Sequence, residues 1–313
     1  MFMQAPKLEA LHLTHLDLDT LNFPWHQLTT LLLGHVNTGM DHIQQVLSHC
    51  TALYDLELRR CNIEGERAPP NTSISLPRLE TLLYEAHDND AGLLRSLHIP
   101  ALEELTLTTS VSLQELRICL LLSKPPLTKL RFRQNFWFQD AATMTDVLRM
   151  VPTLEHLSMD FPRGGAFFDT YELDVILTSL DYRGPHQLCP RLSSLTLRQA
   201  TFSDRSADLF IKMLASRSIE GYVTTLPNTV EQFNGLTPDI PDRNAEEAHL
   251  ADPRGDELLK DSRGSEAALS DLTITFAKGR RMKDCFSAAQ LNGIKVLTGG
   301  MYFPTSSSDS DSE

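Results

Sequence analysis

One short stretch, residues 50–63, constrains the fold of this chain more than any other. Its apolar residues stand at relative positions 1, 4, 6, 9 and 11, filled by Leu53, Leu56, Leu58, Cys61 and Ile63. Side chains at positions 4 and 6 of an extended segment point to one side, and the residues between them point to the other. The pattern therefore predicts a short strand with one buried face and one polar face.

The first part of this pattern recurs along the chain. Copies of Leu-x-x-Leu-x-Leu, with other apolar residues allowed in the last position, begin at Leu8, Leu28, Leu53, Leu79, Leu102, Leu127, Leu154, Leu192 and Leu269. The first seven are separated by 20, 25, 26, 23, 25 and 27 residues, intervals typical of leucine-rich repeats, whose period is roughly 20 to 29 residues. A single copy buries too little apolar surface to fold alone, so neighbouring copies must stack.

Between the copies, apolar residues recur every third or fourth position, which is the period of an amphipathic helix. This period predicts helices over residues 41–47, 111–122, 140–150, 171–180 and 206–214. Short strands that alternate with helices predict an α/β fold. Specifically, we expect a leucine-rich repeat horseshoe, or solenoid, with a parallel concave sheet and convex helices.

The spacing of the copies divides the chain into four predicted segments. Leucine-rich repeats are expected over residues 1–217, and a terminal repeat with a capping helix over residues 267–301. Residues 218–266 hold eleven acidic and four basic residues together with four prolines, a composition that predicts a mostly disordered acidic insertion. Residues 302–313 are rich in serine and acids and are predicted to form a disordered tail.

Charge and cysteine content narrow the class of protein. A net charge of −13 disfavours a nucleic-acid partner, because an acidic surface repels phosphate. The five cysteines lie far apart and no leader sequence opens the chain, so we expect reduced thiols in an intracellular protein, cytoplasmic or nuclear. The longest apolar-rich window, residues 113–122, is far shorter than the roughly 18 residues of a membrane span, which predicts no membrane contact.

Sequence motifs give no support for catalysis or for a metal site. The chain has no nucleophile elbow, P-loop, His-Glu-x-x-His or glycine-rich dinucleotide motif, so we expect no enzyme, no catalytic residue and no cofactor. Cys-x-x-Cys pairs are missing as well, which favours buried structural cysteines over metal ligands. His12 and His15 are close enough in sequence to share a metal, but solvated imidazoles are the favoured interpretation.

Several copies carry a fuller phrase that resembles a known family. The phrases include Pro6-Lys-Leu-Glu-Ala-Leu-His-Leu, Ile99-Pro-Ala-Leu-Glu-Glu-Leu-Thr-Leu and Cys189-Pro-Arg-Leu-Ser-Ser-Leu-Thr-Leu. They resemble the irregular leucine-rich repeat half of fungal F-box proteins, over residues 6–216 and again from Leu269. The F-box itself, a helical module ahead of the repeats, is not present in this chain, whose first copy begins at Leu8.

The resemblance implies a non-catalytic protein–protein interaction module. Its role would be the substrate-recognition part of an F-box type ubiquitin ligase subunit. A ligase adaptor would be a partner only if an F-box lies upstream. The alternative is a free-standing leucine-rich repeat scaffold without a ligase role.

Positions 3, 5 and 7 of each copy are expected to face outward from the concave sheet. In the early copies these positions are mainly acidic, with Asp55, Glu57, Arg59, Glu85 and Glu104. A later copy instead presents three cations followed by an aromatic residue, Lys129, Arg131, Arg133 and Trp137. Such a group suits an acidic or phosphorylated peptide, with arginine forks for the anion and Trp137 as an anchor. Alternatively, Arg131 and Lys129 pair with neighbouring glutamates and the aromatic residues fill a loop core.

Overall fold

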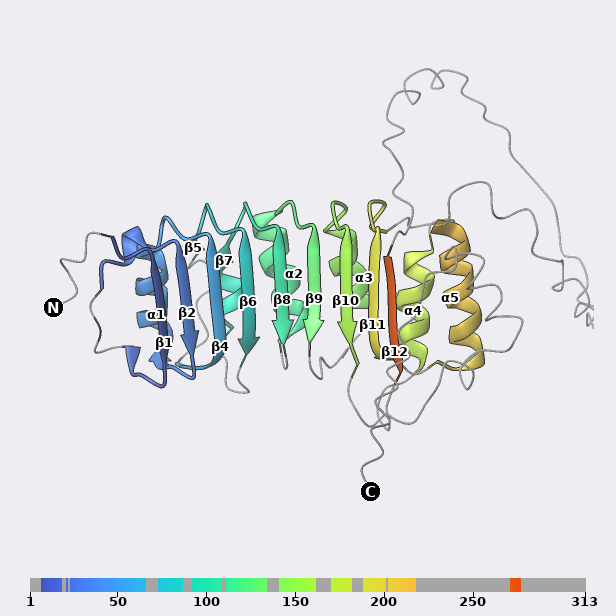
Figure 1. The fold of residues 1–313 in the computed structure, drawn as a ribbon, viewed down its shortest axis with the longest axis horizontal. Helices are drawn as coiled ribbons and strands as arrows, with labels where there is room; N and C mark the ends of the chain where they lie inside the picture. Colours follow the sequence, from blue (N-terminus) through green and yellow to red (C-terminus); the bar gives the residue numbers. More distant parts are fainter. Residues whose placement is uncertain are drawn as a thin grey trace, which may run out of the picture.

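One parallel sheet dominates the fold of the chain (Figure 1). The computed structural model describes residues 7–18, 21, 23–65, 73–86, 92–108, 111–133, 141–161, 170–181, 188–200, 202–217 and 271–276. Neighbouring strands follow one another in chain order: β1 (Ala10–Thr14), β2 (Thr30–Gly34), β4 (Asp55–Glu64), β6 (Thr81–Ala86), β8 (Glu104–Thr108), β9 (Lys129–Arg133), β10 (His156–Asp160), β11 (Ser194–Ala200) and β12 (Asp271–Phe276). Each predicted copy contributes one of these strands, which confirms the strand predictions.

Short elements join the main strands. Strand β3 (Asn37–Gly39) pairs with the end of β4, while β5 (Ile74–Ser75) and β7 (Leu97–His98) pair with each other. Two 3-10 helices, η3 (Trp25–Gln27) and η4 (Leu93–Ser96), replace longer helices between some of the copies. They lie in the two shortest intervals between copies, of 20 and 23 residues.

The register of the sheet places equivalent positions of the copies side by side. At position 3, Thr30 pairs with Asp55, and Asp55 pairs with Thr81. The same row continues through Glu104, Lys129, His156, Ser194 and Asp271. Because a shift by one residue would turn the leucines to the solvent side, the leucine pattern and the register support each other.

A repeated pair of backbone hydrogen bonds lies at the start of each main strand from β2 to β11. The carbonyl oxygen of Glu80 accepts the N–H groups of Glu103 and Glu104, both at 2.9 Å. Equivalent pairs of bonds run to the carbonyls of Glu9, Thr29, Tyr54, Glu80, Glu103, Thr128 and Glu155. Each copy from Leu28 to Leu192 is therefore fixed to the preceding one by the same main-chain contacts, whatever side chains it carries.

Helices cover one face of the sheet. They are α1 (Met40–His49), α2 (Leu113–Ser123), α3 (Ala141–Arg149), α4 (Thr170–Leu180) and α5 (Asp204–Arg217), which confirms the five predicted helices. In α1 the buried residues Met40, Ile43, Val46 and Leu47 recur at helical spacing and join the leucines of the strands in one core. Figure 1 shows α1, α2 and α3 behind the strands, so the opposite side of the sheet is the open face.

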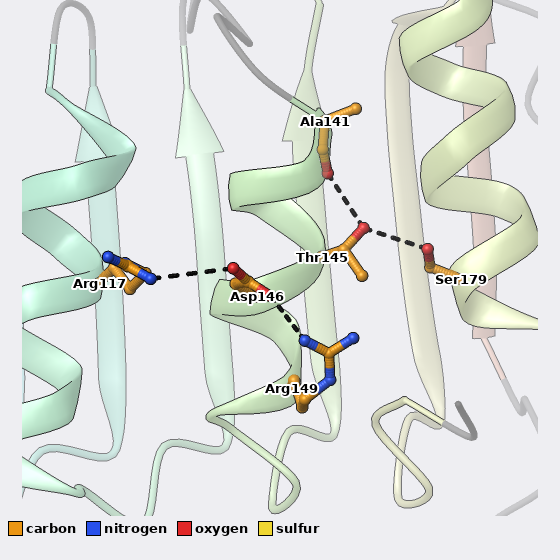
Figure 2. A network of polar contacts seen from close by, with 6 residues as sticks. All are labelled: Arg117, Ala141, Thr145, Asp146, Arg149 and Ser179. Atoms are coloured by element: carbon orange, nitrogen blue, oxygen red, sulfur yellow. Dashed lines mark hydrogen bonds and ion pairs between the residues drawn. The ribbon is translucent and has the colours of Figure 1, made fainter. Parts of the chain in front are cut away.

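Neighbouring helices also touch through polar side chains (Figure 2). Arg117 of α2 reaches Asp146 of α3, with 3.9 Å between Nη1 and Oδ2. On the next helix pair, the hydroxyl oxygens of Thr145 and Ser179 lie 3.1 Å apart. Ion pairs as exposed as Arg117–Asp146 contribute little to stability. The apolar core therefore holds the helix layer to the sheet.

The helix α5 is fixed at both ends by buried polar contacts. At its start, the hydroxyl of Ser203 accepts the N–H of Ser206 at 3.1 Å, an N-terminal cap. The Ser206 hydroxyl in turn donates to Asp174 of α4 at 2.5 Å. At its end, the guanidinium of Arg217, only 4% exposed, donates to the carbonyls of Leu180, Leu188 and Cys189, at 2.7, 2.6 and 3.1 Å.

The described cysteines are buried free thiols, as predicted: Cys50, Cys61, Cys119 and Cys189. The thiol of Cys61 fills the consensus cysteine position and donates to the carbonyl of Leu33 in the preceding copy, at 3.3 Å. Burial raises the pKa of Cys50, Cys119 and Cys189 to about 12. These thiols therefore stay protonated at neutral pH, and they are poor nucleophiles.

We expect these thiols to resist alkylation in the native protein at pH 9, where an ordinary thiol is substantially ionised. In a Cys285→Ser variant, iodoacetamide should label the chain at least ~100-fold more slowly in buffer than in urea, since both burial and the raised pKa protect the sulfur. Because the folded pKa values exceed the unfolded ones, the free energy of unfolding should fall as pH rises from about 9 to 12. Equal labelling rates in buffer and urea would contradict the burial of these residues.

Some predicted segments lie outside the described residues. They are the acidic insertion 218–266, the tail 302–313 and the capping helix of residues 267–301; of the last segment the structure describes strand β12. Among the helices that the structure describes, none has the length and apolar character needed to cross a membrane.

Candidate functional site

The candidate site lies on the open face of the sheet, toward which positions 3, 5 and 7 of the copies on β8 to β11 are directed. In β8, for example, Leu105 and Leu107 are buried toward the helices, while Glu104 and Thr106, which alternate with them, are partly exposed. The same alternation holds in β9, where Leu130 and Phe132 are buried. The residues predicted to form the binding face, Trp137 excepted, lie on strands of this sheet at outward positions.

The acidic part of the open face is largely neutralised by internal pairs. Glu57 Oε2 lies 2.6 Å from Arg59 Nη2, an ion pair without hydrogen-bond geometry. Glu85 Oε1 accepts a hydrogen bond from Arg60 Nε at 2.6 Å. Only Asp55 of the four predicted carboxylates has no cation paired with it among the described residues. Burial, together with the charge of Glu57, raises the pKa of Asp55, and the charge of His12 opposes this shift.

The basic part of the face is only partly neutralised. Lys129 Nζ donates to Glu104 Oε1 on the adjacent strand β8. This is the lysine–glutamate pair that the alternative interpretation predicts. Arg131 is half-buried and Arg133 is exposed. Neither arginine pairs with a carboxylate of the described residues. Two positive charges of strand β9 are therefore available to a ligand.

These arginines line a shallow hollow of about 340 Å³ on the open face. The hollow extends over three adjacent strands, β9, β10 and β11. Its lining residues are Lys129, Arg131, Arg133, His156, Leu157, Ser158, Asp160, Ser194, Thr196 and Arg198. Four of them carry positive charge and only Asp160 carries negative charge, so the hollow is basic on a chain whose net charge is −13.

The register explains the shape of the hollow. Arg131, Ser158 and Thr196 lie level with one another on the three strands. Short hydroxyl side chains at the second and third of these positions leave a depression between the longer side chains of β9 and Arg198 of β11. The hollow is thus a consequence of side-chain size at equivalent positions of neighbouring copies.

The structure adds residues to the candidate site that were not singled out from the sequence. Arg198 of β11 pairs with Asp160, its register partner on the adjacent strand β10, with 3.7 Å between Nε and Oδ1, and His156 lies beside Lys129 in register. All three occupy outward positions of the repeat pattern, and this was the only feature of the sequence that could have identified them. These side chains line the hollow because Ser158 and Thr196 leave a depression beside them. The repeat pattern alone does not reveal this depression.

Trp137, the predicted aromatic anchor, lies outside the described residues. The structure therefore places eight of the nine predicted site residues, and it brings Lys129, Arg131 and Arg133 to one hollow. Asp55, Glu57, Arg59 and Glu85 lie on β4 and β6, outside the hollow lining. The predicted site thus divides into a basic hollow and a separate, mostly paired acidic area.

Histidines and acids of the described residues show no metal-binding arrangement. No group of three or more histidine, cysteine, aspartate or glutamate side chains within that part of the chain is suited to a metal ion. The ring of His15 instead stacks on that of His35, with centroids 4.7 Å apart and planes 6° apart. His12 is exposed on β1.

The hollow also contains serine, histidine and aspartate side chains, the components of a hydrolytic triad. His156 and Asp160 stand four residues apart on strand β10, a separation of about 13 Å along an extended strand. A triad requires a hydrogen bond between these groups, so they do not form one here. The donors around the hollow are instead arranged to hold an anion.

The chain matches no protein-family model and no curated protein.

Proposed function

We propose that this chain is a non-catalytic protein–protein interaction module that binds an acidic segment of a partner in the basic hollow. The observation that carries the proposal is the pair Arg131 and Arg133, two guanidinium groups on one strand without a carboxylate partner among the described residues. Fully buried arginines in proteins are almost always paired, whereas half-buried Arg131 and exposed Arg133 leave room for an outside partner. A ligand carboxylate or phosphate would supply the counter-charge through bidentate hydrogen bonds.

The proposed scaffold is a leucine-rich repeat horseshoe with its concave sheet facing the partner. Support comes from strands at each predicted copy, from the equivalent register along the sheet, and from the repeated backbone bonds before each strand. Horseshoes of this class bind proteins on an extended concave surface. The side chains of the open face then decide which partner is bound.

The charge distribution of the chain attracts an acidic partner only close to the hollow and not over long distances. With a net charge of −13, the whole chain repels an acidic partner, whereas the hollow attracts it over a distance set by ionic screening, about 8 Å at physiological salt. Such an arrangement rejects acidic proteins that cannot place a segment directly in the hollow. Specificity is thereby gained at some loss of association rate.

The double substitution Arg131→Gln and Arg133→Gln tests this function. We expect binding of a library of glutamate-rich peptides to weaken by about 10-fold or more, because each charge-assisted hydrogen bond contributes roughly 1.5 to 3 kcal/mol. Fluorescence anisotropy with labelled peptides measures the change. Arg205→Gln, on the distant helix α5 and 76% exposed, alters the net charge by one unit and should leave binding unchanged.

A lysine-rich library of the same length provides the second comparison. The wild-type chain should bind it at least 10-fold more weakly than the glutamate-rich library, consistent with a basic site. Equal binding of the two libraries, or unaltered binding by the double variant, would refute the proposed function.

We further propose, from the resemblance to fungal F-box proteins, that the bound partner is a substrate for a ubiquitin ligase. The chain would be the substrate-recognition part of an F-box type subunit. A free-standing scaffold is the alternative. Removing this chain from cells should lengthen the half-life of a captured partner in the first case and leave it unchanged in the second.

A further inference from the structure

The basic hollow presents hydrogen-bond donors from opposite sides. Arg131 and Arg133 stand on strand β9, and Arg198 stands on strand β11. Strand β10 lies between them, so the two sides are separated by about 10 Å of backbone, two strand spacings. Long arginine side chains span such a distance. A ligand group at the centre can therefore be approached by guanidinium groups from both sides.

The floor between the arginines is lined with hydroxyl groups. Ser158 of β10 and Thr196 of β11 pair in register, and both line the hollow. Serine and threonine hydroxyls donate hydrogen bonds and rotate to suit the acceptor. The centre of the hollow thus has donors below it as well as beside it.

This arrangement suits a tetrahedral anion better than a planar one. A carboxylate has two oxygens in one plane and a single negative charge, and one arginine fork satisfies it. A phosphomonoester has three terminal oxygens and a charge of about −1.5 to −2 at neutral pH. Its oxygens point in several directions, as the donors of the hollow do.

We infer that the hollow selects a phosphoserine or phosphothreonine of the partner segment over a glutamate or aspartate, with Arg198 and the hydroxyl floor as the groups that discriminate. The inference rests on the proposed function, because it names the chemical class of the segment bound in the same hollow.

Electrostatic attraction supports the same order of preference. Glu104 neutralises Lys129, and Asp160 partly neutralises Arg198 at 3.7 Å, while Arg131 and Arg133 keep their full charge. The hollow therefore has a net positive potential. Because the interaction energy is proportional to the ligand charge, a phosphate gains nearly twice the attraction of a carboxylate at the same place.

The surroundings of the hollow favour a peptide over a nucleic acid. The basic area extends over three strands and borders Glu104 on β8, and Glu85 lies one strand further away, on β6. Nucleic acids carry a phosphate every few ångströms along the backbone, so a strand laid across the sheet would place phosphates against these carboxylates. A single phosphorylated side chain avoids them.

Three peptide libraries of one design test the inference on the full chain. Each peptide has a fixed central residue between five random residues on either side, and the centre is phosphoserine, glutamate or serine. We expect the phosphoserine library to bind about 10-fold more tightly than the glutamate library, and inorganic phosphate to compete. Arg198→Gln should reduce this ratio to about 3-fold or less, and Thr196→Val should reduce it in the same direction. Arg131→Gln should weaken both libraries, and Arg205→Gln should weaken neither.

The possible outcomes separate the inference from the proposed function. Equal affinity for the phosphoserine and glutamate libraries would overturn the inference and leave acidic-segment binding intact. Binding of neither library would overturn both. A single-stranded oligonucleotide, or vesicles containing phosphoinositides, that bind more tightly than the phosphoserine library would also overturn it. Thermal unfolding of each variant at the wild-type temperature excludes misfolding as the cause of lost binding.

Discussion

Replacing Arg217 with methionine is expected to lower the free energy of unfolding by about 2 to 4 kcal/mol. The side chain is buried at the end of α5 and donates to the carbonyls of Leu180, Leu188 and Cys189. The carbonyl of Cys189 also accepts the N–H of Leu192, so the loss falls mainly on the other two carbonyls. Methionine fills similar space without supplying a donor.

Urea unfolding followed by circular dichroism measures this change. Arg205→Met is the matched control, because it removes the same charge from the same helix at a position that is 76% exposed. Its ion pair with Asp174 Oδ2, at 3.3 Å, should contribute less than about 1 kcal/mol. If the two variants were destabilised equally, the hydrogen bonds of Arg217 would not be the stabilising interaction.

Leu116→Ala in α2 is expected to destabilise the protein by about 2 to 5 kcal/mol. The leucine is fully buried, at 0% exposure, in the core between α2 and the sheet. Truncation removes apolar contacts and leaves a cavity that the close-packed neighbours fill only in part. Because each copy is stabilised through its neighbours, we expect strands β8 and β9 to lose protection against hydrogen exchange as well.

The same helix offers a matched control, since Leu121 is 57% exposed. Leu121→Ala makes the same chemical change without creating a cavity, and its effect should stay within about 0.5 kcal/mol. Equal midpoints of urea unfolding for the two variants would show that α2 does not pack on the sheet as described.

The strands and helices were predictable because local sequence patterns determine them. Leu130 and Phe132 alternate with Arg131, so burial of one set turns the other outward regardless of which strand is adjacent. The spacing of successive leucine triads also orders the strands, since short connections keep neighbouring copies adjacent. Parallel order and the outward positions on β9 followed from these patterns.

Side-chain pairing was much less predictable. Glu104 and Lys129 are separated by a whole copy in sequence, and only the register brings them into contact. Arg60 reaches Glu85 in the same way, although it follows the outward positions of its own copy. The acidic group thus resembles a binding surface in the sequence but is mostly paired in the folded chain.

The hollow depends on side chains that give no functional signal in the sequence. Ser158 and Thr196 carry no charge, and their importance arises from being shorter than their neighbours at the same level of the sheet. Arg198 belongs to a copy far along the chain from Arg131. The distance between Arg131 and Arg198 in the folded chain depends on how several copies stack. A pattern within one copy therefore does not predict it.

The paired backbone bonds before each strand have an evolutionary consequence. They link main-chain atoms only, and the buried leucines point away from the open face, so substitutions at the outward positions leave both untouched. Mutation can therefore alter the ligand preference of the surface one residue at a time while the architecture is inherited unchanged. A duplicated copy would bring its own attachment to the preceding one, and it would add a fresh row of positions on which selection for a new partner could act.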